Sequence, residues 1–355
     1  MKSGIRSALI SQSGDIYNLG DVHRFLNELN LYKHVGARFL CWLIIIGKLP
    51  PNRSIWVSKL SEMHESYVNS LKSFFNDENI DNFRDKSPLE FIKNKWSNVL
   101  NGDLKRTEVW FRKMTLQIGI QEYYLKGVRL RAERIITMIY YNSNNISQVK
   151  KQIYSYSQGN DRFVWVSFLI SLYFASHGGL DADFAESMSF YLAQFFILNN
   201  KISKNIENLD YLSHHFGKLD AMVSHEEPEI YKYLSQSQHS ALQYALKWEL
   251  TMFSDEHNDI YELMLIWDSI LERFDHHNRF IQCLALAHIK QVPLPALPDE
   301  MAMTIQQYRK WDTYKIIKDG IELFEEEEED SCCNYITKLF LSYLRCSGKD
   351  VILSI

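Results

Sequence analysis

Apolar residues recur at helical spacing along most of the chain. Between residues 54 and 75 they lie three or four positions apart, as on one face of a long helix capped by Ser54. These apolar positions are Leu60, Met63, Tyr67, Leu71 and Phe74. Residues 163–175 are apolar on nearly every face, which predicts a buried central helix. Because sustained alternation and strand–turn–strand signals are missing from the sequence, it predicts an all-α fold with many helices of about 10 to 20 residues.

Prolines, glycines and polar clusters mark where these helices should begin and end. The predicted helices occupy residues 36–48, 54–75, 87–100, 131–141, 148–156, 163–175, 184–198, 206–215, 230–236, 241–253, 260–273, 300–324 and 335–344. Ser87 and Pro88 form a good helix start, and that helix should end near Asn101 and Gly102. Residues 142–145 should form a polar turn. No fixed repeat period appears, so a regular solenoid is not expected.

Composition and charge narrow the classes of function. The chain has 355 residues, of which 46% are hydrophobic and 23% charged, so it can bury a large core. A net charge of only -5 argues against a nucleic-acid binder held by clustered cations. The longest apolar stretches, residues 39–46 and 163–175, are shorter than the roughly 20 residues of a membrane span. We therefore expect a soluble protein that binds no nucleic acid and has no transmembrane segment.

Cysteine and histidine placement gives no sign of a metal site or a secreted disulfide scaffold. The five cysteines show no C-x-x-C spacing, and their odd number fits reduced thiols in the cytoplasm. Residues 1–11 lack the apolar core of a secretory signal. The adjacent pairs at 214–215 and 276–277 would point about 100° apart on a helix, so we expect solvated or capping histidines there. The P-loop, H-E-x-x-H and G-x-S-x-G motifs are also missing from the sequence.

Two short segments contain candidate functional residues. Residues 100–107 read LNGDLKRT and contain Asp103 and Arg106, whereas residues 156–159 read YSQG and contain Gln158. Both segments lie beside predicted helix ends, from which a long polar side chain can project into a partner. An isolated D-x-x-R is most often a surface ion pair worth roughly 0 to 1 kcal/mol, so neither segment is specific by itself.

Together with four further blocks, these segments resemble the TBC domains that activate Rab GTPases. The first segment is similar to the family's I-x-x-D-x-x-R-T signature, with Leu100 in the Ile place, and the second to Y-x-Q-G. The other blocks follow the family's order and lie at residues 36–42, 186–190, 248–253 and 265–268. The resemblance covers roughly residues 32 to 290 and implies a multi-helical TBC fold with N-terminal and C-terminal helical halves.

The resemblance implies a dual-finger mechanism, with Arg106 as arginine finger and Gln158 as glutamine finger. Phosphoryl transfer from GTP to water needs a positioned water and stabilisation of charge on the phosphoryl oxygens. A guanidinium offers planar, permanently charged donors, and a carboxamide can accept from water while donating to phosphate. The chain would supply these groups in trans rather than hydrolyse GTP alone.

The remaining candidate residues have supporting or partner-contacting roles by the same resemblance. Asp103 would orient Arg106 through a hydrogen bond, and Thr107 and Tyr156 would support the fingers or touch the partner. Gly159 would allow close backbone approach. For Arg38, in the opening block, a structural and a partner-contacting role both remain open. Three tryptophans of the matching blocks are expected to be core anchors: Trp42, Trp248 and Trp267.

The implied partner is a Rab-family small GTPase in its GTP form. GTP and Mg²⁺ would belong to that partner, and the chain would carry no cofactor and no metal of its own. We expect a monomer in the cytoplasm, peripheral on endomembranes through its partner and acting in vesicle traffic. The expected organisation is an N-terminal extension over residues 1–31, a TBC domain over 32–300 with halves at about 32–178 and 179–300, and a C-terminal helical extension over 301–355 with an acidic run.

Some residues depart from the family pattern, and two other functions remain open. Asn160 and Asp161 follow Gly159 where the family usually has Met and Asn, and Asp161 would add negative charge near a phosphate-binding site. Lys247 stands where Arg is common. One alternative is a catalytically weak TBC-fold effector or scaffold that binds Rab without raising GTP turnover. The other is a purely structural helical protein that binds no Rab.

Overall fold

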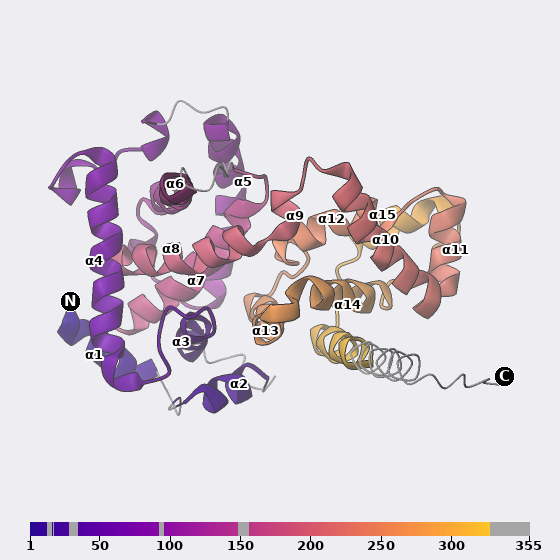
Figure 1. The fold of residues 1–355 in the computed structure, drawn as a ribbon, viewed down its shortest axis with the longest axis horizontal. Coiled ribbons are helices and arrows are strands. Elements are labelled where there is room, and N and C mark those ends of the chain that lie inside the picture. Colours follow the sequence, from indigo (N-terminus) through magenta and orange to yellow (C-terminus); the bar gives the residue numbers. More distant parts are fainter. Residues whose placement is uncertain (13–15, 17, 28–34, 92–95, 148–155, 327–355) are drawn as a thin grey trace, which may run out of the picture.

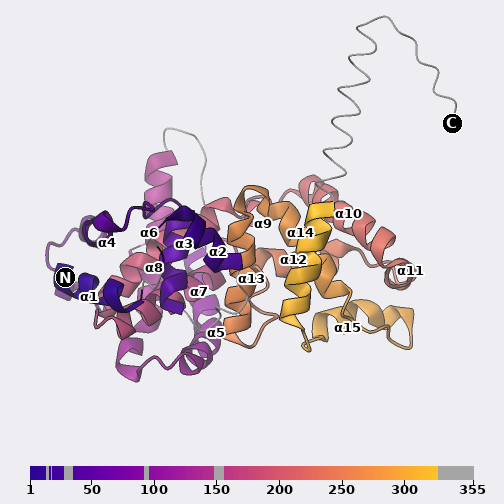
Figure 2. The same cartoon turned by 90° about the horizontal axis from the view of Figure 1, so that it is seen from below.

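The computed structural model describes residues 1–12, 16, 18–27, 35–91, 96–147 and 156–326, and these form helices and connecting loops. No strand occurs within those ranges, so the predicted all-α class is confirmed. The molecule is elongated: α1 to α8 form one half and α9 to α15 the other (Figure 1). The same division is visible from below, where the helix over residues 313–326 lies in the second half with α9 to α15 (Figure 2).

The N-terminal half contains the following helices. They are α1 (Lys2–Gln12), α2 (Leu19–Asn27), α3 (Val35–Ile45), α4 (Trp56–Phe75), α5 (Trp96–Gln117), α6 (Val128–Ser147), α7 (Asn160–His177) and α8 (Ala182–Asn199). Short 3-10 turns lie at Arg53–Ile55, Ile80–Asn82, Pro88–Glu90 and Glu122–Leu125. The predicted helix over residues 148–156 falls almost entirely outside the described residues.

The C-terminal half continues the helical pattern. Its helices are α9 (Lys201–Lys204), α10 (Leu209–Glu226), α11 (Pro228–Gln236), α12 (Ala241–Thr251), α13 (Ile260–Glu272), α14 (His277–Ile289) and α15 (Met301–Gln307). A further helix covers residues 313–326. The predicted helix over 335–344 and most of the acidic run lie outside the described residues.

Helix α7 is the centre of the N-terminal half, as its sequence predicted. From Phe163 to Leu172 every residue of α7 is buried, because α3, α5, α6 and α8 pack around it. The helix ends at Gly178, as predicted, and α1 packs on α4 and α7 with Ile5 and Ala8 fully buried. A helix that is apolar on all sides is stable only when neighbours cover every face.

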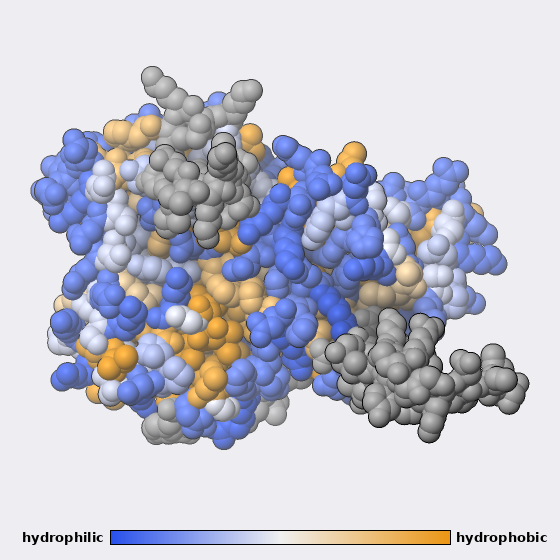
Figure 3. Space-filling view, viewed as in Figure 1, coloured by the Kyte–Doolittle hydropathy of each residue, from blue (hydrophilic) through white to orange (hydrophobic). Residues whose placement is uncertain are grey.

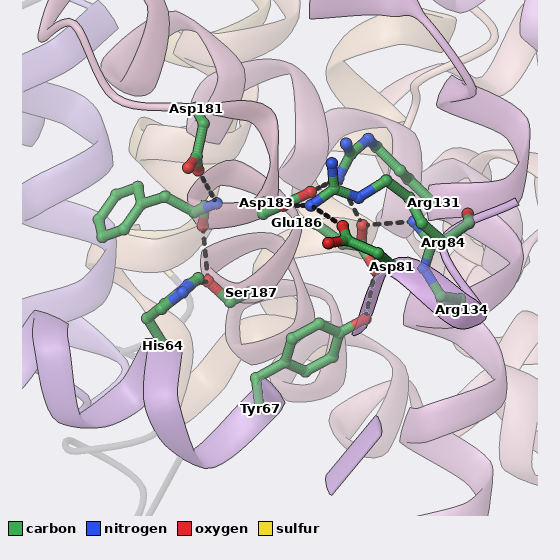
Figure 4. A network of polar contacts seen from close by, with 11 residues as sticks. His64, Tyr67, Asp81, Arg84, Arg131, Arg134, Asp181, Asp183, Glu186 and Ser187 are labelled. Atoms are coloured by element: carbon green, nitrogen blue, oxygen red, sulfur yellow. Dashed lines mark hydrogen bonds and ion pairs between the residues drawn. The ribbon is translucent and has the colours of Figure 1, made fainter. Parts of the chain in front are cut away.

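A buried carboxylate ties three helices of this half together (Figure 4). Glu186 on α8 is 3% exposed and accepts a hydrogen bond of 2.9 Å from the Tyr67 hydroxyl on α4. Arg134 donates to both Glu186 oxygens at 2.8 Å, and Arg131 donates to Oε2 at 2.8 Å. Because buried charges are tolerated only when paired and hydrogen-bonded, these contacts explain the glutamate of the block at residues 186–190.

The two halves meet at a second buried ion pair. Arg38 on α3 is 1% exposed, and its Nε donates to Asp268 Oδ2 on α13 at 2.5 Å. Trp42 Nε1 donates to Asp268 Oδ1 at 2.8 Å, and the rings of Trp42 and Trp267 stack at 5.7 Å. Together with Trp248, these tryptophans are at most 1% exposed, so their predicted role as core anchors is confirmed.

Several predicted helix boundaries are wrong. Helix α5 continues through Asn101 and Gly102, and only a 3-10 turn follows Ser87. Helix α6 runs through residues 142–145, which were expected to form a turn. The single helix expected over 300–324 is two helices, separated at residues 308–312.

In each adjacent histidine pair, the first ring is exposed, as expected, and the second is not: His214 and His276 are exposed, whereas His215 and His277 are not. His215 is 9% exposed, and its Nε2 lies 2.6 Å from Glu249 Oε2. His277 Nδ1 lies 2.7 Å from the Phe274 carbonyl. His277 thus makes a local contact of the capping kind that was expected, whereas His215 joins α10 to α12, which was not expected.

The surface is polar over much of the face in Figure 3, with apolar atoms gathered around α3. An open hollow beside the end of α3 is lined partly by Ile44, Ile45 and Phe195. Within the described ranges, no helix is both long enough and apolar enough to cross a bilayer.

Candidate functional site

Helix α5 presents Arg106 on its outer face. Leu100, Leu104 and Phe111 lie on the opposite face and are fully buried, which anchors the helix in the N-terminal half. The Arg106 side chain is 64% exposed. A Cβ at Gly102, one turn earlier, would lie 3.4 Å from Arg106 Nη1, so this glycine leaves room for the guanidinium. Arg106 thus projects from the middle of a long helix. The sequence had suggested a helix end instead.

Gln158 lies directly before α7, where the chain turns sharply. Gly159 is the N-cap of α7 with φ of +101°, a region that L-residues other than glycine rarely adopt. Asn160 then anchors the first turn, since its Nδ2 donates to the Tyr140 hydroxyl at 2.7 Å. The turn leaves Gln158 exposed beside α5.

One buried carboxylate brings Arg106 and Gln158 together. Asp103 is 3% exposed, and its Oδ1 accepts from Arg106 Nη2 and, at 3.4 Å, from Gln158 Nε2. Its other oxygen, Oδ2, accepts from the Tyr156 hydroxyl at 2.7 Å. The guanidinium and the carboxamide therefore share one acceptor atom, although they come from different elements about 50 residues apart.

Thr107 connects α5 to α7 just beneath this pair. Its Oγ1 accepts from Trp165 Nε1 at 2.7 Å and lies 2.9 Å from the Asp103 carbonyl and 2.8 Å from Asp161 Oδ2. Burial raises the pKa of Tyr156, which keeps its hydroxyl protonated as a donor to Asp103. The supporting groups are thus neutral donors arranged around two carboxylates.

Asp161, whose negative charge was expected near the site, is buried within this framework. It is 2% exposed and lies 3.2 Å from the Tyr156 hydroxyl as well as beside Thr107. Burial raises the pKa of its carboxyl above the ordinary 3.8. In the protonated form Asp161 can donate to Thr107, which leaves the Thr107 proton for the Asp103 carbonyl.

An open hollow lies beside the two exposed side chains. Its walls come from α5, from the turn before α7, from α12 and from the α12–α13 loop. The lining residues are Asp103, Arg106, Thr107, Tyr156, Ser157, Gln158, Gly159, Asp161, Arg162, Ile206, Leu246, Lys247, Leu250, Thr251 and Asp255. Six of the seven sequence-predicted site residues therefore meet at one place.

The seventh, Arg38, lies elsewhere in the molecule. It is buried against Asp268 at the junction of the two halves and does not line the hollow. Of the two roles left open for Arg38, this position supports the structural one.

A cluster of charges across the hollow was missed by the sequence analysis. Asp255 in the α12–α13 loop pairs with Arg162 on α7, and its Oδ2 lies 2.9 Å from Lys247 Nζ on α12. The Arg162 guanidinium also lies 4.7 Å from the centre of the Trp110 ring on α5. Only Lys247 gave a signal in the sequence, as a departure from the family pattern. The cluster joins α5, α7 and α12 around the hollow.

Comparison with known protein families places the chain in one of them. The family model for the Rab-GTPase-TBC domain matches residues 36–293, close to the range of the sequence resemblance. The chain belongs to this family, and a Rab GTPase is the partner class that membership implies.

A solved structure with the same fold supports the assignment of fold class. The crystal structure of the Ypt/Rab-GAP domain of Gyp1p superposes with a TM-score of 0.60 and 16% sequence identity, over 92% of this chain and 98% of that one. At such low identity the similarity concerns the fold. No curated protein sequence matches the chain.

We expect Gly159→Ala to destabilise the protein and to lower any activity that depends on Gln158. The backbone would hold the new alanine at a positive φ, which costs about 1–2 kcal/mol. Its Cβ would also lie 3.4 Å from Thr251 Cγ2. Thermal unfolding measures the effect. Gly217→Ala is the matched control: Gly217 lies within α10, with nothing within 4 Å of an added Cβ, so that variant should be neutral or slightly more stable. Equal stability of the two variants would contradict the expected strain.

Asp161→Asn should gain stability over the wild type as pH rises. Because the folded-state pKa of Asp161 is raised, its contribution is fully present below pH 3.8 and is lost as pH rises through the folded pKa. Asparagine resembles the protonated carboxyl and does not titrate. Unfolding free energies of both proteins, measured from acid to neutral pH, should separate by about 1.4 kcal/mol for each unit of pKa elevation. A gap that narrows with rising pH would contradict the burial argument.

Proposed function

We propose that this chain accelerates GTP hydrolysis on a Rab-type GTPase by inserting Arg106 and Gln158 into the partner's nucleotide site. The observation that supports this most strongly is the shared Asp103 oxygen, which holds the two exposed side chains together at the rim of an open hollow. Such a pair suits phosphoryl transfer, which depends on positioning and charge stabilisation more than on covalent chemistry.

In this mechanism each side chain has a separate task. The Arg106 guanidinium neutralises charge that develops on the γ-phosphoryl and leaving oxygens. The Gln158 carboxamide accepts from the attacking water and donates to a phosphate oxygen. Asp103 and Tyr156 are positioning residues that reduce the conformational freedom of the fingers before the partner binds. GTP and Mg²⁺ come with the partner, so the chain needs no cofactor of its own.

The direct test is GTP turnover by a broad panel of purified Rabs, each with and without this protein. The proposal expects faster hydrolysis for at least one GTP-loaded Rab. Binding to GTP-loaded Rab without faster turnover would instead support an effector or scaffold. Failure to bind any Rab of the panel would favour a purely structural role. Association with endomembranes and a part in vesicle traffic follow only from the first outcome.

A further inference from the structure

The outer face of α5 carries large apolar side chains in line with Arg106. Val109 is 73% exposed, Leu116 75% and Val99 48%. At 100° per residue, these three side chains and Arg106 fall within an arc of roughly 100° around the helix axis. Lys113 is exposed on the same arc. We call Val99, Val109, Lys113 and Leu116 the α5 outer face.

Two apolar side chains of the α5 outer face are unusually exposed. Single exposed apolar residues are normal on a soluble protein. Here, however, Leu116 and Val109 are, with Ile10, the three most exposed large apolar side chains among the described residues. Two of the three therefore lie on the one helix that also presents the proposed arginine finger. Exposed apolar side chains that flank a functional polar residue are typical of a binding site.

Helix geometry identifies what would cover this face. With a rise of 1.5 Å per residue, Val109 lies about 4.5 Å along the axis from Arg106, and Val99 about 10 Å in the other direction. A protein that accepts the Arg106 guanidinium in a recessed nucleotide site must rest its rim on the helix surface around that residue. The occupant is therefore the same GTPase that receives Arg106.

We propose that the α5 outer face is a docking surface for that GTPase, an inference that rests on the function proposed above. The matching surface on the partner is an apolar patch beside the nucleotide site, flanked by an acidic side chain that faces Lys113. Val109 and Leu116 contribute to binding and partner choice, whereas the chemistry stays with Arg106 and Gln158.

The test compares Val109→Asp and Leu116→Asp with wild type on a GTPase that responds to the protein. Each variant should raise KM for the GTP-loaded GTPase by about tenfold or more, because an apolar contact is lost and a charge is left facing it. Turnover at saturation should stay within about twofold of wild type. Ile10→Asp is the matched control, since Ile10 is also 73% exposed but lies on α1, far from α5 in both views (Figures 1 and 2). This control should keep the wild-type KM.

The outcomes separate the two proposals. If wild type accelerates GTP hydrolysis and both aspartate variants keep its KM, the docking surface is refuted and the proposed function stands. If wild type binds a GTP-loaded GTPase without accelerating hydrolysis, the proposed function fails, and the Kd of the variants still tests the surface. A wild-type chain that binds no GTPase overturns both.

Discussion

Replacing Arg106 by alanine should lower GTP turnover on a responsive Rab by about 10³- to 10⁵-fold, the range associated with an arginine finger. The side chain is 64% exposed beside the hollow, so its removal should leave the fold intact. Single-turnover hydrolysis at saturating protein measures the effect, and thermal unfolding checks the fold. Arg106→Lys should recover little activity, because an ammonium has neither the planar donors nor the same reach.

A matched arginine elsewhere controls for charge. Arg24 on α2 is 61% exposed and pairs with Asp21 at 3.3 Å across the same i,i+3 spacing as Arg106 and Asp103. Arg24→Ala should keep wild-type turnover. Equal losses of turnover in Arg24→Ala and Arg106→Ala would show that the overall charge of the protein is responsible. Wild-type turnover in Arg106→Ala would contradict the arginine-finger assignment.

Gln158→Ala should lower the same rate constant by about 10²- to 10³-fold, as expected for the loss of one positioned donor in the transition state. Gln158→Glu should be at least as damaging, because it keeps the shape of the side chain but brings a negative charge to phosphate. The nearby Asp103 would also repel the new carboxylate. Single-turnover kinetics separates this loss from weaker binding.

The control for Gln158 is an exposed glutamine remote from the hollow. Gln236 at the end of α11 meets this requirement, and Gln236→Ala should behave as wild type. If Gln158→Ala lost activity only through a higher KM, Gln158 would be a contact residue and not a catalytic one.

The spacing of apolar residues predicted most of the helices, because residues buried on one face of a helix recur every three or four positions. The central helix at 163–175 and the end at Gly178 follow directly from a run that is apolar on every face. The long helix at 54–75 follows from its single apolar stripe, and the structure has α4 there.

At two of the wrong boundaries, tertiary contacts override local signals. Asn101 and Gly102 resemble a helix end, and a glycine inside a helix costs about 1 kcal/mol. The burial of Leu100 and Leu104 on either side outweighs that cost, so α5 continues past Gly102. Near the C-terminus, the break at 308–312 coincides with an ion pair of 2.9 Å between Arg309 and Glu256, which local sequence could not show.

Six candidate residues named from the sequence lie together in the structure, but their geometry could not be predicted. The pairing of Arg106 with Gln158 came from family resemblance, since no spacing rule joins residues so far apart. The role of Asp103 as acceptor for both side chains became visible only in the structure. For Asp161, the sequence gives the charge of the side chain but not its burial.

The most direct test of the central claim uses GDP with aluminium fluoride, which imitates the phosphoryl group in transfer. Wild-type protein should form a stable complex with a responsive Rab carrying GDP, Mg²⁺ and aluminium fluoride, because both fingers bind that mimic. Arg106→Ala and Gln158→Ala should fail to form it while still binding the GTP-loaded Rab. If both variants captured the aluminium fluoride state as tightly as wild type, the claim that these two side chains stabilise the transition state would be wrong.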